Sequence, residues 1–120
     1  MNENEKSSIM TCWFYIFNSE LKKASEILQS INASNPNGVV LTGWIEIMKN
    51  TSTSLQQALN IFTESVEKNS SNLELLLGKC VASERLKKFT VTIDSINATI
   101  VEFPDFQPAL EIKAKVLKLE

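Results

Sequence analysis

The chain has 120 residues, the size of one domain or part of one, and a formal net charge of −2 from 12 basic and 14 acidic residues. No run of lysine or arginine is long enough to give the basic surface of a nucleic-acid-binding protein. The chain has no histidine, which excludes Ser-His-Asp catalysis, Cys-His catalysis and the HExxH zinc motif. Its two cysteines cannot complete a zinc site without other ligands.

The N-terminal region combines a polar stretch with a strongly apolar one. Residues 1–8 are polar and are predicted to be a disordered leader. Residues 9–17 (IMTCWFYIF) are too few to span a bilayer, and the acidic residues before them are unlike a signal peptide. A core helix over about residues 8–17 is predicted. Its apolar side chains cover most of its circumference, which indicates a missing upstream neighbour.

Apolar residues at spacings of three and four predict six further helices. Their approximate bounds are residues 20–32, 39–49, 54–69, 72–85, 87–101 and 106–119. S-x-x-Q and S-x-x-E capping boxes are predicted to open two of them, at Ser54 and Ser71. The segment 87–101 is rich in β-branched residues, which would suit a strand. Its apolar residues nevertheless recur at helical spacing, so a helix is predicted with Phe89, Ile93, Ile96 and Ile100 on its inward face.

A 34-residue period relates the second helix of each pair. Small or short side chains recur at Ala24, Ala58 and Thr92, bulky apolar ones at Leu28, Phe62 and Ile96, and helix-ending residues at Pro36, Ser70 and Pro104. This is the length of the tetratricopeptide (TPR) repeat, two antiparallel helices that stack into a solenoid. The prediction is an all-α, TPR-like solenoid of about three helix pairs (9–36, 37–70, 71–104) and a final helix (105–120). An ordinary helical bundle is the alternative.

Nothing in the sequence indicates catalysis. The three glycines are scattered, so no phosphate-binding loop is predicted, and Cys12 and Cys80 are expected to be reduced, half-buried thiols. The aromatic residues are expected to be core, namely Trp13, Phe14, Tyr15, Phe17 and Trp44. Partner contacts are predicted on the exposed side of the first helix of each pair, with Tyr15, Glu46, Lys49 and Lys79 as candidates. A basic clamp for C-terminal carboxylates is disfavoured, because residues 8–17 contain no basic residue.

Four strings in order carry a resemblance to a known family: residues 41–47 (LTGWIEI), 58–62 (ALNIF), 76–79 (LLGK) and 103–109 (FPDFQPA). Together they resemble the tetratricopeptide repeat protein 21 family, the large TPR subunit of intraflagellar transport complex A. The resemblance covers residues 9–120.

The resemblance implies a non-enzymatic scaffold for retrograde ciliary transport, cytoplasmic and located in the cilium or flagellum. Its partners would be other complex A subunits, with no cofactor, metal, nucleic acid or membrane insertion. Self-association through apolar solenoid ends is also expected. The alternative function is a generic TPR adaptor or co-chaperone that binds a peptide in its concave groove.

Overall fold

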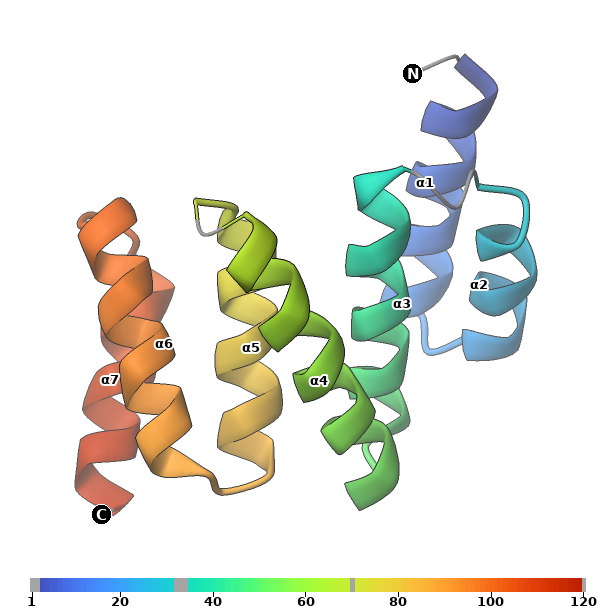
Figure 1. Cartoon of the computed structure of the whole chain (residues 1–120). Coiled ribbons are helices and arrows are strands. Elements are labelled where there is room, and N and C mark those ends of the chain that lie inside the picture. Colours follow the sequence, from blue (N-terminus) through green and yellow to red (C-terminus); the bar gives the residue numbers. More distant parts are fainter. Residues whose placement is uncertain (1–2, 32–34, 70, 120) are drawn as a thin grey trace.

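The structure, a computed structural model, describes residues 3–31, 35–69 and 71–119. Within these residues seven helices follow one another (Figure 1): α1 (Glu3–Phe17), α2 (Leu21–Leu28), α3 (Pro36–Lys49), α4 (Ser52–Lys68), α5 (Leu73–Arg85), α6 (Phe89–Glu102) and α7 (Gln107–Leu119). Each helix packs on its neighbours in sequence, and α1, α3 and α5 also pack side by side. The stack measures 43 × 28 × 23 Å. That its pairs form one repeat domain with the predicted boundaries stays a prediction.

The first helix is longer than predicted. α1 begins at Glu3, so residues 3–8 are helical and not a disordered leader. Acidic side chains suit the positive end of a helix dipole, and the Glu5 carboxylate accepts a hydrogen bond from Asn35 Nδ2 at 3.0 Å. This bond ties the start of α1 to the start of α3. Met1 and Asn2 lie outside the described residues, and no described helix is both long and apolar enough to cross a membrane.

Both predicted capping boxes are wrong in register. The cap of α4 is Thr51, whose Oγ1 accepts the Ser54 N–H at 3.1 Å, and Ser54 is buried in the first turn. The cap of α5 is Asn72, whose Oδ1 accepts the Leu75 N–H at 3.1 Å, one position after the predicted Ser71. Each true cap has an extended backbone, which is the conformation that a cap residue needs.

Pro36 begins a helix instead of ending one. It is the first residue of α3, and Asn35 caps that helix by accepting the Asn37 N–H at 2.9 Å. Proline is favoured at this position because its missing N–H would have no partner there and its φ is already helical. α3 therefore starts three positions before the predicted residue 39. The predicted stop at Ser70 lies outside the described residues.

The 34-residue period correctly identifies residues of the core. Ala24, Ala58 and Thr92 are fully buried, as are Phe62 and Ile96, while Leu28 is half-buried. Three buried clusters, between α1–α3, α3–α5 and α5–α7, follow one another along the stack. Each pair therefore buries its apolar face against the next pair, as in a solenoid.

Phe62 is wedged between two helices of neighbouring pairs. Its ring lies against Gly43 of α3 and Gly78 of α5, and a Cβ placed on either glycine would overlap the ring atoms. At Gly78 the distance from that Cβ to Phe62 Cζ would be 2.5 Å. The two glycines are thus required by close packing, although neither has a positive φ. The glycines look scattered in the sequence, but the 35-residue separation of Gly43 and Gly78 is close to the repeat length.

The ambiguous segment is confirmed as a helix, α6, but its buried stripe is more polar than predicted. Thr92, Ser95, Ile96 and Thr99 are buried, whereas the predicted Phe89, Ile93 and Ile100 are only half-buried. Hydroxyl groups bond across the α5–α6 contact, with 2.8 Å between Ser83 Oγ and Thr92 Oγ1. The helix predicted from the apolar spacing is confirmed, but α5 packs against a more polar face of α6 than the predicted one.

Ser95→Ala is expected to raise the free energy of unfolding by about 0.5–1.5 kcal/mol. Ser95 Oγ is buried without a hydrogen-bond partner in the described part of the chain, and alanine also has the higher helix propensity. Urea unfolding followed by circular dichroism measures the change. The control is Ser83→Ala, which removes a hydroxyl bonded to Cys80 O at 3.0 Å and should cost about 1 kcal/mol. Equal losses in both variants would contradict the prediction.

Candidate protein-binding groove

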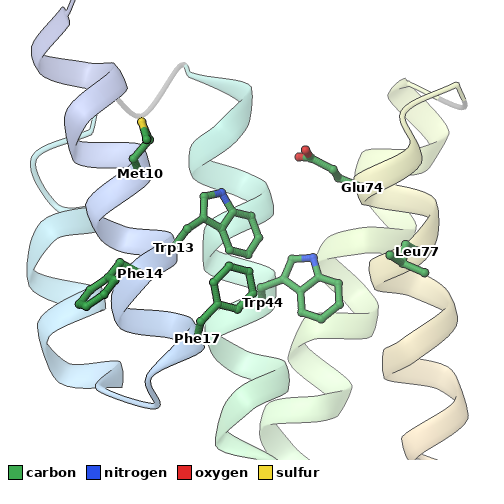
Figure 2. A pocket seen from close by; sticks show the side chains of 7 residues that line it. All are labelled: Met10, Trp13, Phe14, Phe17, Trp44, Glu74 and Leu77. Atoms are coloured by element: carbon green, nitrogen blue, oxygen red, sulfur yellow. The ribbon is translucent and has the colours of Figure 1, made fainter. Parts of the chain in front are cut away.

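A groove of about 730 Å³ runs along the face built by α1, α3 and α5 (Figure 2). We call it the aromatic groove; the described residues that line it are Met10, Trp13, Phe14, Phe17, Trp44, Glu74 and Leu77. Six of these seven side chains are apolar or aromatic. A groove of this volume is in the range that holds drug-sized ligands, so it suits a few side chains of a partner.

α1 supplies most of the groove because two of its faces are apolar. Cys12 and Ile16 are buried on one face, whereas Met10, Phe14 and Phe17 are 72%, 59% and 75% exposed on another. The prediction that Phe14 and Phe17 belong to the core is therefore wrong. α1 has core partners, α2 and α3, on only one side, and an apolar helix needs neighbours all around to be fully buried.

The two tryptophans give the groove a fixed wall. The Trp13 ring stacks on Phe17 with 5.6 Å between centroids, and the Trp44 ring meets Phe62 edge-on at 6.3 Å. Both indoles are half-buried and pack on the central core cluster. The predicted core role is thus correct for one side of each tryptophan ring, while the other side lines the groove. Aromatic rings held in this way lose little conformational entropy on binding.

Glu74 is the one charged residue among the described residues that line the groove. It forms no ion pair or hydrogen bond with another described residue. α1 does contain a basic residue, Lys6, which the predicted helix span left out, but Lys6 does not line the groove. The electrostatic character of the groove is therefore opposite to that of a carboxylate clamp.

The four residues predicted to contact a partner lie outside this lining. Tyr15 packs on the α1–α3 cluster, with Lys23 Nζ 5.5 Å from its ring centroid. Glu46 and Lys49 pair with each other at 2.9 Å, and Lys79 is half-buried elsewhere on α5. That they contact a partner stays a prediction.

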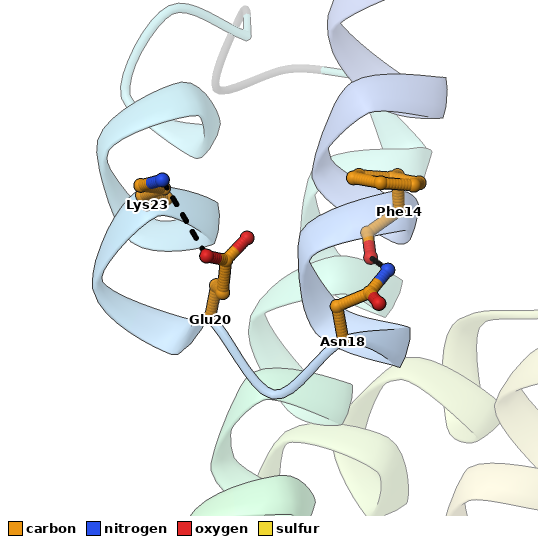
Figure 3. Close-up of polar contacts among 4 residues, drawn as sticks. All are labelled: Phe14, Asn18, Glu20 and Lys23. Carbon is orange, nitrogen blue, oxygen red and sulfur yellow. Dashed lines mark hydrogen bonds and ion pairs between the residues drawn. The ribbon is translucent and has the colours of Figure 1, made fainter.

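Polar side-chain contacts surround the C-terminal end of α1, near Phe14 (Figure 3). Asn18 Nδ2 donates to the carbonyl oxygen of Phe14 at 2.8 Å, and Lys23 pairs with Glu20 at 3.4 Å in the next turn. The intervening Ser19 has a left-handed φ of 61°. The last carbonyl groups of α1 are also satisfied by the backbone, since the N–H groups of Ser19 and Glu20 donate to the carbonyl oxygens of Ile16 and Tyr15 at 3.1 and 2.8 Å. Phe14 and Phe17 therefore lie on a capped helix end.

Both cysteines are buried free thiols, more buried than predicted. Burial raises the pKa of Cys12, and it raises the pKa of Cys80 to about 11 against a partial offset from the Thr99 hydroxyl. A nucleophilic cysteine needs a lowered pKa, so neither thiol has that character. No group of His, Cys, Asp and Glu side chains within the described ranges could hold a metal ion.

The raised pKa of Cys80 gives a pH dependence of stability. The folded state keeps the thiol neutral, while the unfolded chain ionises it from about pH 9. The contribution to stability is therefore complete below pH 9 and is lost as the pH rises through about 11. Relative to Cys80→Ala, the intact chain should lose about 2 kcal/mol of unfolding free energy between pH 8 and pH 11. Urea titrations at several pH values measure this difference, and parallel curves for the two proteins would contradict it.

Comparison with known proteins identifies relatives of the chain. A family profile described as "Tetratricopeptide repeat protein 21 N-terminal ARM repeat" matches residues 1–119. The chain is 23% identical over 107 residues to tetratricopeptide repeat protein 21B of Xenopus laevis, covering 89% of this chain and 8% of that protein. It is 29% identical over 86 residues to the Homo sapiens protein of the same name, covering 72% and 6%. The chain thus spans less than a tenth of the length of these relatives.

A solved structure is similar in fold. It is a tetratricopeptide repeat protein from Parabacteroides merdae ATCC 43184, with a TM-score of 0.70 and 19% sequence identity. The match covers 96% of this chain and 46% of that chain. It confirms the predicted all-α, TPR-like fold class.

Proposed function

Since this chain belongs to the tetratricopeptide repeat protein 21 family, we propose that it is a non-enzymatic scaffold segment that binds protein partners along the face of α1, α3 and α5. The aromatic groove is the observation that carries this proposal. Large apolar side chains exposed together on a folded chain mark interaction surfaces. Repeat proteins use the continuous face of stacked helices for this purpose.

The partners proposed are other subunits of intraflagellar transport complex A, and the location is the cytoplasm of the cilium or flagellum. The family resemblance supports this assignment, because family members help to build complex A for retrograde transport. The chain spans only 6–8% of its curated relatives. The segment would therefore contribute one stretch of a longer binding surface.

Affinity capture tests the proposal. The tagged chain is immobilised and incubated with a ciliated-cell extract. The bound proteins are then identified by mass spectrometry. The groove variant carries Met10→Gln, Phe14→Gln and Phe17→Gln, which change exposed side chains and should preserve folding. The control is Val101→Gln, at a side chain on α6 that is 79% exposed and outside the groove lining.

We expect complex A subunits with the intact chain and with Val101→Gln, and a large loss with the groove variant. Circular dichroism checks that all three chains are equally helical. Recovery of chaperones alone, or of nothing, by a folded intact chain would overturn the complex A assignment. Equal recovery by the groove variant would show that partners bind elsewhere.

A further inference from the structure

We propose that the aromatic groove receives an apolar segment of a protein partner that carries one arginine, whose guanidinium group packs on the tryptophan rings and pairs with Glu74. This inference rests on the proposed function, because it names the chemistry of the partner that such a scaffold would bind. Three features of the groove support it: its charge, its aromatic faces and its free N–H donors.

The charge of the groove favours a cation in the partner. Glu74 is the charged member of an otherwise apolar lining, and no described residue neutralises it. An apolar partner that covered the groove would remove water from this carboxylate. Burying a charge without a partner is costly, whereas a paired and hydrogen-bonded charge is tolerated. A partner with one positive charge at this position therefore fits better than a wholly apolar or acidic one.

The aromatic rings favour arginine over lysine. Trp13 and Trp44 line the groove together with Glu74, and the face of tryptophan is the strongest aromatic site for a cation. A guanidinium group is planar, is weakly hydrated and presents a fork of N–H donors to a carboxylate. It offers a planar face to an indole ring and N–H donors to the Glu74 carboxylate. The compact ammonium group of lysine makes only one of these contacts well.

The indole N–H groups favour a polypeptide as the ligand. Neither Trp13 nor Trp44 donates a hydrogen bond within the described ranges of the chain. In Figure 2 both indole nitrogens lie on the upper edges of their rings, the side on which Glu74 is drawn. Donors of this kind need acceptors when water is excluded. Backbone carbonyl oxygens of a bound segment would supply them.

A displayed library of random 15-residue peptides tests the inference. Selection on the intact chain, with counter-selection on the Glu74→Lys variant, should enrich sequences that hold one arginine between apolar residues. A selected peptide and its Arg→Gln version are then synthesised, and their affinities are measured by the change in tryptophan fluorescence. Selection of peptides without a cation, or no selection at all, would overturn the inference.

A double-mutant comparison links the arginine to Glu74. We expect Glu74→Gln and the Arg→Gln peptide each to weaken binding about tenfold. The combination should weaken binding little more than either change alone, because both remove the same contact. The matched control is Glu64→Gln, an exposed carboxylate on α4 outside the groove, and it should leave affinity unchanged. Independent losses from the two changes would overturn the pairing.

Two further outcomes separate this inference from the proposed function. Capture of complex A subunits by a chain whose peptides show no arginine dependence would overturn the inference alone. Arginine-dependent peptide binding by a chain that captures no complex A subunit would overturn the complex A assignment alone. The inference would also be overturned if the chain sediments as a dimer and its tryptophan fluorescence shows that Trp44 is buried in that dimer. A second copy of the chain would then occupy the groove.

Discussion

Phe62→Ala is expected to lower the free energy of unfolding by about 3–5 kcal/mol, the range for truncating a buried aromatic core residue. The Phe62 ring is fully buried at the centre of the stack, where α4 meets α3 and α5. Gly43 and Gly78, which lie against the ring, have no side chains that could move to fill the space. The resulting cavity would remain open, and a cavity that cannot collapse gives losses at the upper end of the range.

Urea unfolding followed by circular dichroism at 222 nm measures this loss. The matched control is Phe14→Ala, which removes the same ring from a position that is 59% exposed and should change stability by less than about 1 kcal/mol. A loss of 3–5 kcal/mol is a large part of the 5–15 kcal/mol typical of a domain. An unfolded Phe62→Ala chain would therefore agree with the prediction, and similar losses in the two variants would contradict it.

The sequence was sufficient to predict the repeat because the residues of the second helices are set by close packing within and between pairs. Ala58 and Phe62 show this: a small side chain and a bulky one recur at fixed positions, and both are fully buried. Such constraints act on residue size, so they are visible as a period. The same reasoning correctly chose a helix for about residues 87–101 against the local strand propensity, and the structure has a helix at Phe89–Glu102.

The groove was not predictable from the sequence for a different reason. The spacing of Met10, Phe14 and Phe17 shows that they share one face of a helix, but it does not show whether another helix covers that face. Burial depends on which neighbours are present, and α1 has them on one side only. The same apolar pattern therefore fits both a core face and an exposed binding face.

The positions of charged and capping residues also depended on tertiary structure. Glu74 appeared in the sequence as part of a capping box, because it lies three residues after Ser71. With Asn72 as the true cap, Glu74 is the second residue of α5, and its side chain lines the groove. That role depends on how α5 packs beside α3, which the local sequence pattern does not show.

Gly78→Ala is expected to destabilise the chain by about 1–3 kcal/mol, although alanine is the better helix former. In an exposed helix the change would be favourable by about 1 kcal/mol. Here the new methyl group would lie 2.5 Å from Phe62 Cζ and 2.6 Å from two neighbouring ring atoms, and overpacking a tight core costs about 1–3 kcal/mol or occasionally more. Gly43→Ala meets the same ring from α3 and should behave in the same way.

The Phe62→Leu background tests whether the ring is the cause. Leucine lacks the outer ring atoms that the new methyl group would meet, so Gly78→Ala should cost much less in that background or become neutral. The difference between the two costs is the coupling between residues 62 and 78. A cost of Gly78→Ala that is unchanged by Phe62→Leu would contradict the wedge. Rescue would show that α3 and α5 need glycine at these positions because Phe62 fills the space between the pairs. The TPR period would then be linked directly to the packing that holds the groove helices together.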